Sequence, residues 1–241
     1  MGAASSYSGR FHEVDAMRGI AVVMMIVYHV IFDLDFLGAV ELDLNSPIIW
    51  LTGRLAAFLF IFLVGVSLSL SHSRRGSGVP GHYIRRGVMI FIYGLLITAA
   101  TWVYPHEGFI VFGVLHFIGV AVIITYPFAG RRALSLIAAL LALAAGMRVS
   151  GLMVDTPYLL WLGLKPPGFY TLDYFPLLPW LGVVLLGIFT GDTLYPGYRR
   201  RWNGELPGRN HALEFLGKHS LTIYFIHQPV ILAFTWFLMN I

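Results

Sequence analysis

The amino-acid sequence predicts an all-α protein, a bundle of about seven helices that cross a membrane. Of its 241 residues, 58% are hydrophobic and 12% are charged, whereas about a quarter of the residues in a soluble domain are charged. The apolar residues gather in runs of roughly 20, the length that a helix needs to cross the hydrocarbon core of a bilayer. The basic residues lie between these runs. We therefore expect most of the protein surface to face lipid.

Seven apolar runs are candidate membrane spans. They cover residues 17–37, 48–71, 84–104, 108–128, 132–149, 174–194 and 217–239. The fifth run is the shortest and is rich in alanine and leucine. Basic residues precede the first run, as they do in a signal peptide, but His29 and Asp33 lie within it and no small-residue cleavage site follows. We interpret the first run as a retained span.

The distribution of basic residues predicts the orientation of these spans. Of the 16 Lys and Arg residues, only Arg54, Arg148 and Lys165 fall away from one set of loops and helix ends. The positive-inside rule makes the side that carries the others cytoplasmic. We expect a cytoplasmic amino terminus and an external carboxy terminus in the cytoplasmic membrane. The chain is read as a single domain, 1–241, whose outer segment 150–173 lies in the interface or re-enters the membrane.

Composition and motifs exclude several other classes of site. The chain has no cysteine, so it holds no disulfide, thiolate ligand or catalytic thiol. Its basic residues do not form a face with interleaved aromatics, so we expect no nucleic-acid partner. The zinc motif HExxH, the facing histidine pairs of a haem site and a Gly-rich phosphate loop are all missing. We expect no metal.

Polar side chains follow one face of the first span. Asp15, Arg18, His29 and Asp33 recur at helical spacing, and an ionisable group at membrane depth is a functional hypothesis by default. Arg18 and His29 lie about 16 Å apart along a helix. Asp33 follows His29 by one turn, where its carboxylate is expected to accept the Nδ1 proton of the imidazole. The alternatives are a core histidine bonded to a backbone carbonyl and an arginine that snorkels towards lipid phosphate.

Three further polar residues lie within later spans. Counting from the span ends places Arg54 and His116 at the depth of His29, about 9–12 Å below the outer surface. Asp33 is the expected counter-charge for Arg54. His227 precedes Pro229, which kinks a helix and frees backbone carbonyls. A structural ion pair, an inter-helix hydrogen bond and a structural kink are the respective alternatives to functional roles.

Together these segments resemble a known family. Residues 10–29, 62–67, 112–119, 173–180 and 220–229 resemble the transmembrane acyltransferase superfamily. Within it, the chain is most similar to prokaryotic proteins that resemble the catalytic domain of heparan-α-glucosaminide N-acetyltransferase. The spacing of Arg18 and His29 is also found in the related acyltransferase-3 proteins, which acylate surface glycans.

The resemblance implies an acyltransferase. The donor would be acetyl-CoA or another acyl-CoA presented from the cytosol, and the acceptor a hydroxyl or amine of a sugar or a lipid such as a glycolipid. His29 would be the catalytic histidine, as general base or transient acyl carrier, and Arg18 would help to hold the donor. The physical properties of the residues agree, because a cationic rim suits the phosphates of coenzyme A. The alternative explanation of this rim is membrane topology alone. The rim residues are Arg10, Arg74, Arg75, Arg85, Arg86, Arg131 and Arg132.

Further roles follow from this expectation. Asp33 would stabilise the His29 imidazolium, and Arg54 or His116 would steady the tetrahedral oxyanion. His227 is a further substrate or oxyanion contact. The expected partners are the acyl-CoA, the acceptor and membrane lipid, with a homodimer left open. The alternative function is a small transporter or lipid-binding membrane protein, although we find no inverted repeat of the kind that favours transport.

Overall fold

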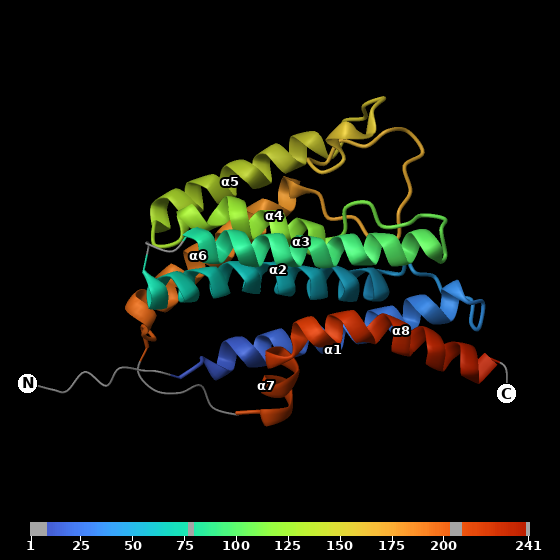
Figure 1. Ribbon diagram of the computed structural model, residues 1–241, viewed down its shortest axis with the longest axis horizontal. Coiled ribbons are helices and arrows are strands. Elements are labelled where there is room, and N and C mark those ends of the chain that lie inside the picture. The colour runs from blue at the N-terminus through green and yellow to red at the C-terminus, as the bar shows by residue number, and fades with distance from the viewer. Residues whose placement is uncertain (1–8, 77–79, 203–208, 240–241) are drawn as a thin grey trace, which may run out of the picture. The chain divides into compact units, whose positions relative to one another are not determined.

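The protein is all-α throughout the part of the chain that the structure describes, residues 9–76, 80–202 and 209–239 (Figure 1). This computed structural model contains α1 (His12–Phe36), α2 (Pro47–Arg75), α3 (Pro80–Val103), α4 (Val114–Thr125), α5 (Arg132–Val149), α6 (Leu177–Leu194), α7 (His211–Lys218) and α8 (Ser220–Met239). Short 3-10 turns lie at Tyr126–Phe128, Pro157–Leu159 and Pro196–Tyr198.

The predicted fold class is confirmed. Among the residues that the structure describes, six helices are long and apolar enough to cross a membrane, and a shorter apolar helix covers Val114–Phe128. The protein is therefore a multi-pass integral membrane protein. The orientation of its termini and the membrane position of residues 150–173 stay predictions.

The ends of most predicted spans differ from the observed helices by a few residues, and two of these differences have a clear structural cause. The fourth begins at Val114 rather than at residue 108, because the preceding residues are extended and Phe112 pairs with Tyr174 in a parallel β-bridge. The seventh is preceded by a separate short helix, α7, which ends at Lys218. The side chain of Asn210 caps α7 by accepting a hydrogen bond from the backbone N–H of Leu213, 3.1 Å away.

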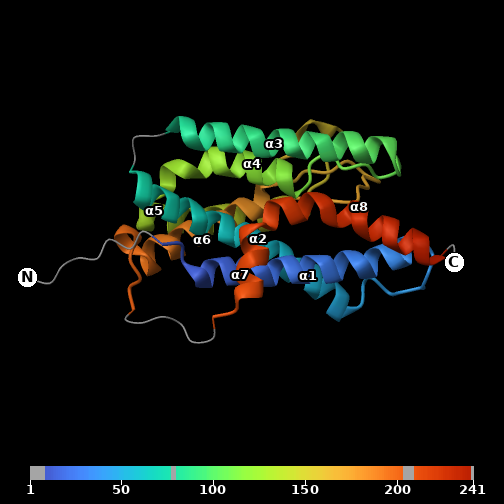
Figure 2. The ribbon, with the colours of Figure 1, turned by 60° about the horizontal axis from the view of Figure 1, so that its bottom comes forward.

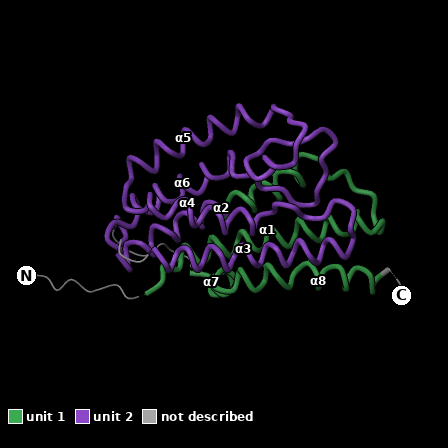
Figure 3. Tube along the Cα trace, turned by 45° about the horizontal axis from the view of Figure 1, so that its top comes forward, with its two compact units in different colours: residues 1–60, 204–241 green, residues 61–203 purple. Residues whose placement is uncertain are grey.

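The chain forms two compact units (Figure 3). Unit 1 comprises residues 1–60 and 204–241, and unit 2 comprises residues 61–203. In unit 1, α7 lies across α1 at two glycines (Figure 2). A Cβ on Gly19 would lie 2.1 Å from the carbonyl oxygen of Leu213, and a Cβ on Gly217 would lie 1.8 Å from that of Asp15. Only glycine permits the two backbones to approach so closely.

Unit 2 has its own apolar core. Phe117, Ile61 and Ile188 are fully buried at its centre. The backbones of α2 and α6 meet at Gly65 and Gly187, where a Cβ would contact the facing carbonyl oxygens at about 2 Å. Close packing at small residues is typical of helices that associate within lipid.

Two connections of unit 2 are joined into one ordered cap. The connection before α4 and the connection before α6 share hydrogen bonds from Leu172 N to Gly108 O (2.8 Å) and from Phe175 N to Phe112 O (3.0 Å). The carboxylate of Asp173 accepts from the backbone N–H of Val114 at 2.9 Å, at the first residue of α4. Burial raises the pKa of Asp173 to about 6, although this hydrogen bond opposes the shift.

This raised pKa predicts how the stability of unit 2 depends on pH. Because the folded state favours the protonated carboxyl, Asp173 contributes to the free energy of unfolding. This contribution is fully present below the unfolded pKa, near 4, and is lost as the pH rises towards 6. Asp173→Asn is expected to remove this decline, as measured by thermal unfolding in detergent between pH 4 and 7. The control is the matching change at an exposed aspartate, Asp155→Asn, which is expected to leave the pH dependence of stability unchanged. Equal pH profiles for Asp173→Asn and the parent would refute the prediction.

Candidate functional site

The four residues of the predicted polar stripe all lie on α1. Asp33 is fully buried and Asp15 nearly so. Arg18 donates from Nη1 to Asp15 Oδ1 at 2.8 Å, and the same nitrogen lies 3.5 Å from the carbonyl oxygen of Gly217 on α7. The stripe is therefore anchored at its amino-terminal end by an ion pair and by contact with a second helix.

The orientation of His29 differs from the prediction. Its Nδ1 lies 2.8 Å from the carbonyl oxygen of Met25, one turn earlier on α1. Asp33 is not its partner, because the Asp33 carboxylate accepts a hydrogen bond from Gln228 on α8. A carbonyl oxygen can only accept, so Nδ1 carries the proton of the neutral ring and Nε2 presents a lone pair. The expected tautomer is present, but the helix backbone holds it in place of a carboxylate.

A second histidine packs against the first. The rings of His29 and His227 meet edge to face with their centroids 4.7 Å apart. His227 Nδ1 lies 2.7 Å from the carbonyl oxygen of Tyr224, so the same tautomer argument applies. Both imidazoles, when neutral, have their unprotonated Nε2 away from these carbonyls.

Gln228 joins the site and was missed by the sequence reasoning. Its Nε2 donates to Asp33 Oδ1 at 2.7 Å, which links α8 to α1. An amide inside a predicted span, next to His227 and Pro229, was the available signal.

The predicted pairing of Arg54 with Asp33 is wrong for this structure. Arg54 is exposed, and its guanidinium carbon lies 5.5 Å from the centroid of the Trp50 ring, one turn earlier on α2. Within the described residues it has no carboxylate partner. Two contacts explain the difference. Arg54 lies against the Trp50 ring of its own helix, and the Asp33 carboxylate is hydrogen-bonded to Gln228.

His116 lies in unit 2 and caps α4. Its Nδ1 accepts from the backbone N–H of Gly113 at 3.2 Å, so Nε2 carries the proton and donates to Thr98 Oγ1, also at 3.2 Å. The Thr98 hydroxyl in turn donates to the carbonyl oxygen of Ile110 at 2.6 Å. Both ring nitrogens are therefore used in holding the first turn of α4.

Four of the predicted donor-binding arginines lie at one end of unit 2. At that end Tyr83 of α3 stacks on Tyr126 with the ring centroids 5.4 Å apart, and Asp192 of α6 accepts from Ser69 of α2 and from the backbone of Gly130. Arg74, Arg75, Arg85 and Arg86 are all exposed there, with Arg74 lying over the ring of Tyr198. The end therefore presents a cationic surface.

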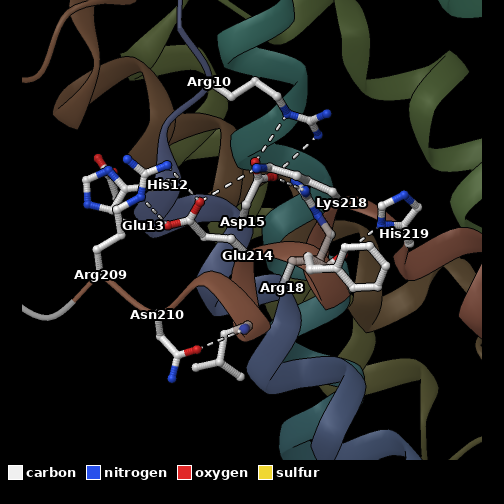
Figure 4. A network of polar contacts seen from close by, with 12 residues as sticks. Arg10, His12, Glu13, Asp15, Arg18, Arg209, Asn210, Glu214, Lys218 and His219 are labelled. Carbon is white, nitrogen blue, oxygen red and sulfur yellow. Dashed lines mark hydrogen bonds and ion pairs between the residues drawn. The ribbon is translucent and has the colours of Figure 1, made fainter.

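Charged pairs lie on both sides of the contact between α7 and α1 in unit 1 (Figure 4). Glu214 of α7 accepts from Arg209 at 2.8 Å and pairs with Lys218 at 3.6 Å. On α1, Asp15 pairs with Arg18 and with Arg10, at 2.8 Å and 3.2 Å. The hydrogen bond from Arg209 lowers the pKa of Glu214, which burial opposes and the two neighbouring cations reinforce.

The lowered pKa predicts an acid-sensitive contact. A carboxyl whose folded pKa is depressed stabilises the fold above its unfolded pKa, and the contribution is lost as the pH falls below about 4. Glu214→Gln is expected to reduce the loss of thermal stability on acidification, whereas exposed Glu41→Gln is expected to leave it unchanged. Unfolding temperatures measured from pH 3 to pH 6 check this, and a full acid transition in Glu214→Gln would contradict it.

No group of three or more His, Asp or Glu side chains is placed to hold a metal ion among the described residues.

A comparison with protein families identifies one that matches most of the chain. The model for the family described as heparan-alpha-glucosaminide N-acetyltransferase, catalytic, matches residues 10–229. The match includes the whole polar stripe of α1, the arginines of unit 2, and His227 and Gln228 of α8. No curated protein and no solved structure matches the chain.

Proposed function

Because the chain belongs to the family of heparan-alpha-glucosaminide N-acetyltransferase catalytic domains, we propose that this membrane acyltransferase uses an acyl-CoA donor and His29 as its base. The family match over residues 10–229 is the observation that carries the proposal. The alternative of a small transporter or lipid-binding protein has no comparable support.

The geometry of His29 suits a general base. Its Nε2 lone pair takes a proton from the hydroxyl or amine of the acceptor. The acceptor oxygen or nitrogen then forms a bond to the thioester carbonyl carbon, and the carbon–sulfur bond breaks. The proton held by His29 passes to the departing thiolate, so the products are the acylated acceptor and free coenzyme A. His227, in ring contact with His29, is the second substrate-facing histidine of the proposal.

The donor is proposed to bind at the cationic surfaces. Arg74, Arg75, Arg85 and Arg86 are exposed at one end of unit 2 and supply charge for the coenzyme A phosphates. Arg18 is only partly buried and is proposed to contact the donor from α1. Acetyl is the proposed acyl group, following the family description.

The remaining predicted residues take different parts. Arg54, which is exposed and has no carboxylate partner in the described chain, is proposed to contact substrate or the oxyanion. His116 is proposed to act as a positioning residue, since both its ring nitrogens hold the start of α4. Asp33 is proposed to act near His29 while its carboxylate is hydrogen-bonded to Gln228, and it does not orient the His29 ring.

The test is turnover of labelled acetyl-CoA by the purified protein in proteoliposomes. Label is expected to move to a sugar amine or hydroxyl in an acceptor panel. Replacing Arg85 and Arg86 together with Gln is expected to raise the KM for acetyl-CoA by tenfold or more, because two phosphate contacts are lost. Binding of acetyl-CoA without transfer to any acceptor would instead favour the transporter or lipid-binding function.

A further inference from the structure

Helix α7 lies across the amino-terminal part of α1 rather than alongside it (Figures 1 and 2). The two helices meet where Gly19 of α1 faces Leu213 and where Gly217 of α7 faces Asp15. Since α1 is long and apolar enough to span a membrane, a helix that crosses it near one end runs along the membrane surface. With eight residues, α7 is itself too short to cross a bilayer.

The two faces of α7 differ in chemistry. Glu214 and Gly217 are buried on the face towards α1. On the other face, Phe215 is 59% exposed, and Lys218 and His219 are exposed beside it. The rings of Phe215 and His219 lie with their centroids 4.3 Å apart. An exposed aromatic ring next to basic side chains is typical of a helix that lies among lipid headgroups.

The acidic and basic side chains at this contact also differ in exposure (Figure 4). The side chains of Asp15 and Glu214 are 4% and 3% exposed. Those of Arg10, Arg209 and Lys218, which pair with them, are 60%, 53% and 37% exposed. The carboxylates therefore lie beneath the surface and the cations lie on it, so this part of unit 1 presents positive charge outwards. Its electrostatic complement is an anion.

We propose that the exposed face of α7 binds the headgroups of anionic phospholipids. Phe215 inserts among the headgroups, and Arg10, Arg209 and Lys218 contact their phosphates through charge-assisted hydrogen bonds. Positive charge near the membrane surface favours lipids of net negative charge. A zwitterionic headgroup binds less well, because its own ammonium group competes with these side chains for the phosphate.

The proposed lipid contact connects the bilayer to the polar stripe of α1. Nη1 of Arg18 lies 3.5 Å from the carbonyl oxygen of Gly217 on α7, and Arg18 pairs with Asp15 on its own helix. Lipid that holds α7 in place therefore also supports this end of the stripe. The inference goes beyond the proposed function and does not depend on acyl transfer.

The experiment places a probe on α7 itself, because the exposed arginines of unit 2 also attract anionic lipid. The chain has no cysteine, so Ala212→Cys, at an exposed position of α7, accepts a single bimane label. The labelled full-length protein is held in phosphatidylcholine nanodiscs that contain increasing amounts of spin-labelled phosphatidylglycerol or spin-labelled phosphatidylcholine, which quench the label on contact. Phosphatidylglycerol is expected to quench at a mole fraction about tenfold lower.

The main variant combines Arg10→Gln with Lys218→Gln. It removes two exposed cations, while each buried carboxylate keeps its shorter ion pair, at 2.8 Å in both cases, to Arg18 or Arg209. The preference for phosphatidylglycerol is expected to fall to about twofold or less, because positive charge near the surface produces it. In a separate variant, Phe215→Ser, the label is expected to become more accessible to aqueous iodide.

The matched control, Arg131→Gln with Arg132→Gln, removes two exposed arginines of unit 2 and is expected to keep the preference at α7. Equal quenching by the two lipids in the parent, or an unchanged preference in the folded main variant, overturns the proposal. Displacement of phosphatidylglycerol by coenzyme A assigns the surface to a soluble anion and overturns it as well. Unchanged iodide access in Phe215→Ser overturns the insertion of that ring. Should the main variant fail to fold, Lys218→Gln alone provides the same test with a smaller expected loss.

Discussion

His29→Ala is expected to lower the rate of acyl transfer by roughly 10²- to 10⁴-fold, the range that a general base contributes. The physical reason is the loss of the Nε2 lone pair, which the bond from Nδ1 to Met25 O presents for proton abstraction. Binding of acetyl-CoA should stay within about twofold of the parent, because the proposed donor contacts are the arginines. Turnover and calorimetric binding on the same preparation measure the two effects.

The matched control is His211→Ala, an exposed histidine on α7 in the same unit. It is expected to retain full turnover. His29→Gln is a second informative variant, since it keeps a polar side chain and lacks an imidazole base. Transfer at more than a tenth of the parental rate in both His29 variants would exclude His29 as the base.

Gly217→Val is expected to detach α7 from α1 and to produce the largest loss of stability among the changes considered. The added Cβ would lie 1.8 Å from the carbonyl oxygen of Asp15, and the obstacle is backbone that a rotamer change cannot move. Overpacking costs typically 1–3 kcal/mol, and a rigid backbone obstacle places this variant at or above the upper end. Thermal unfolding in detergent and protease cleavage near α7 provide the measurements.

Gly81→Ala is the control for this prediction, since a Cβ on Gly81 in α3 would meet no atom within 4 Å. It is expected to be neutral or to stabilise the protein by about 0.5–1 kcal/mol, because alanine loses less backbone entropy in a helix. An unfolding temperature of Gly217→Val equal to that of the parent would mean that α7 does not depend on this crossing.

The helices were predictable because apolar run length alone specifies a span. The start of α4 was not, because Phe112 and the residues before it are apolar but pair with the connection before α6 as extended backbone. Helix α7 is too short to give a membrane signal, and its position depends on contacts made at two glycines far apart in sequence.

Most residues of the candidate site could be predicted from the sequence, but their hydrogen-bond partners could not. Helical spacing placed His29 and Asp33 on one face, and counting residues gave their depth. Neither procedure gives the rotation of α8, which decides that Asp33 meets Gln228. The hydrogen bond from His29 to the Met25 carbonyl is the structural alternative of the sequence analysis, and it leaves the Nε2 lone pair of the neutral ring available.

The hydrogen bond between His29 and Met25 lies within a single turn of one helix, whereas His227 and Gln228 lie on another. The Nδ1 hydrogen bond of His29 is thus made within its own helix, whereas the ring that packs against it, His227, belongs to α8. Under the proposed function, exchanges in α8 away from His227 are expected to alter the contacts to the acceptor while the hydrogen bond that sets the His29 tautomer is retained.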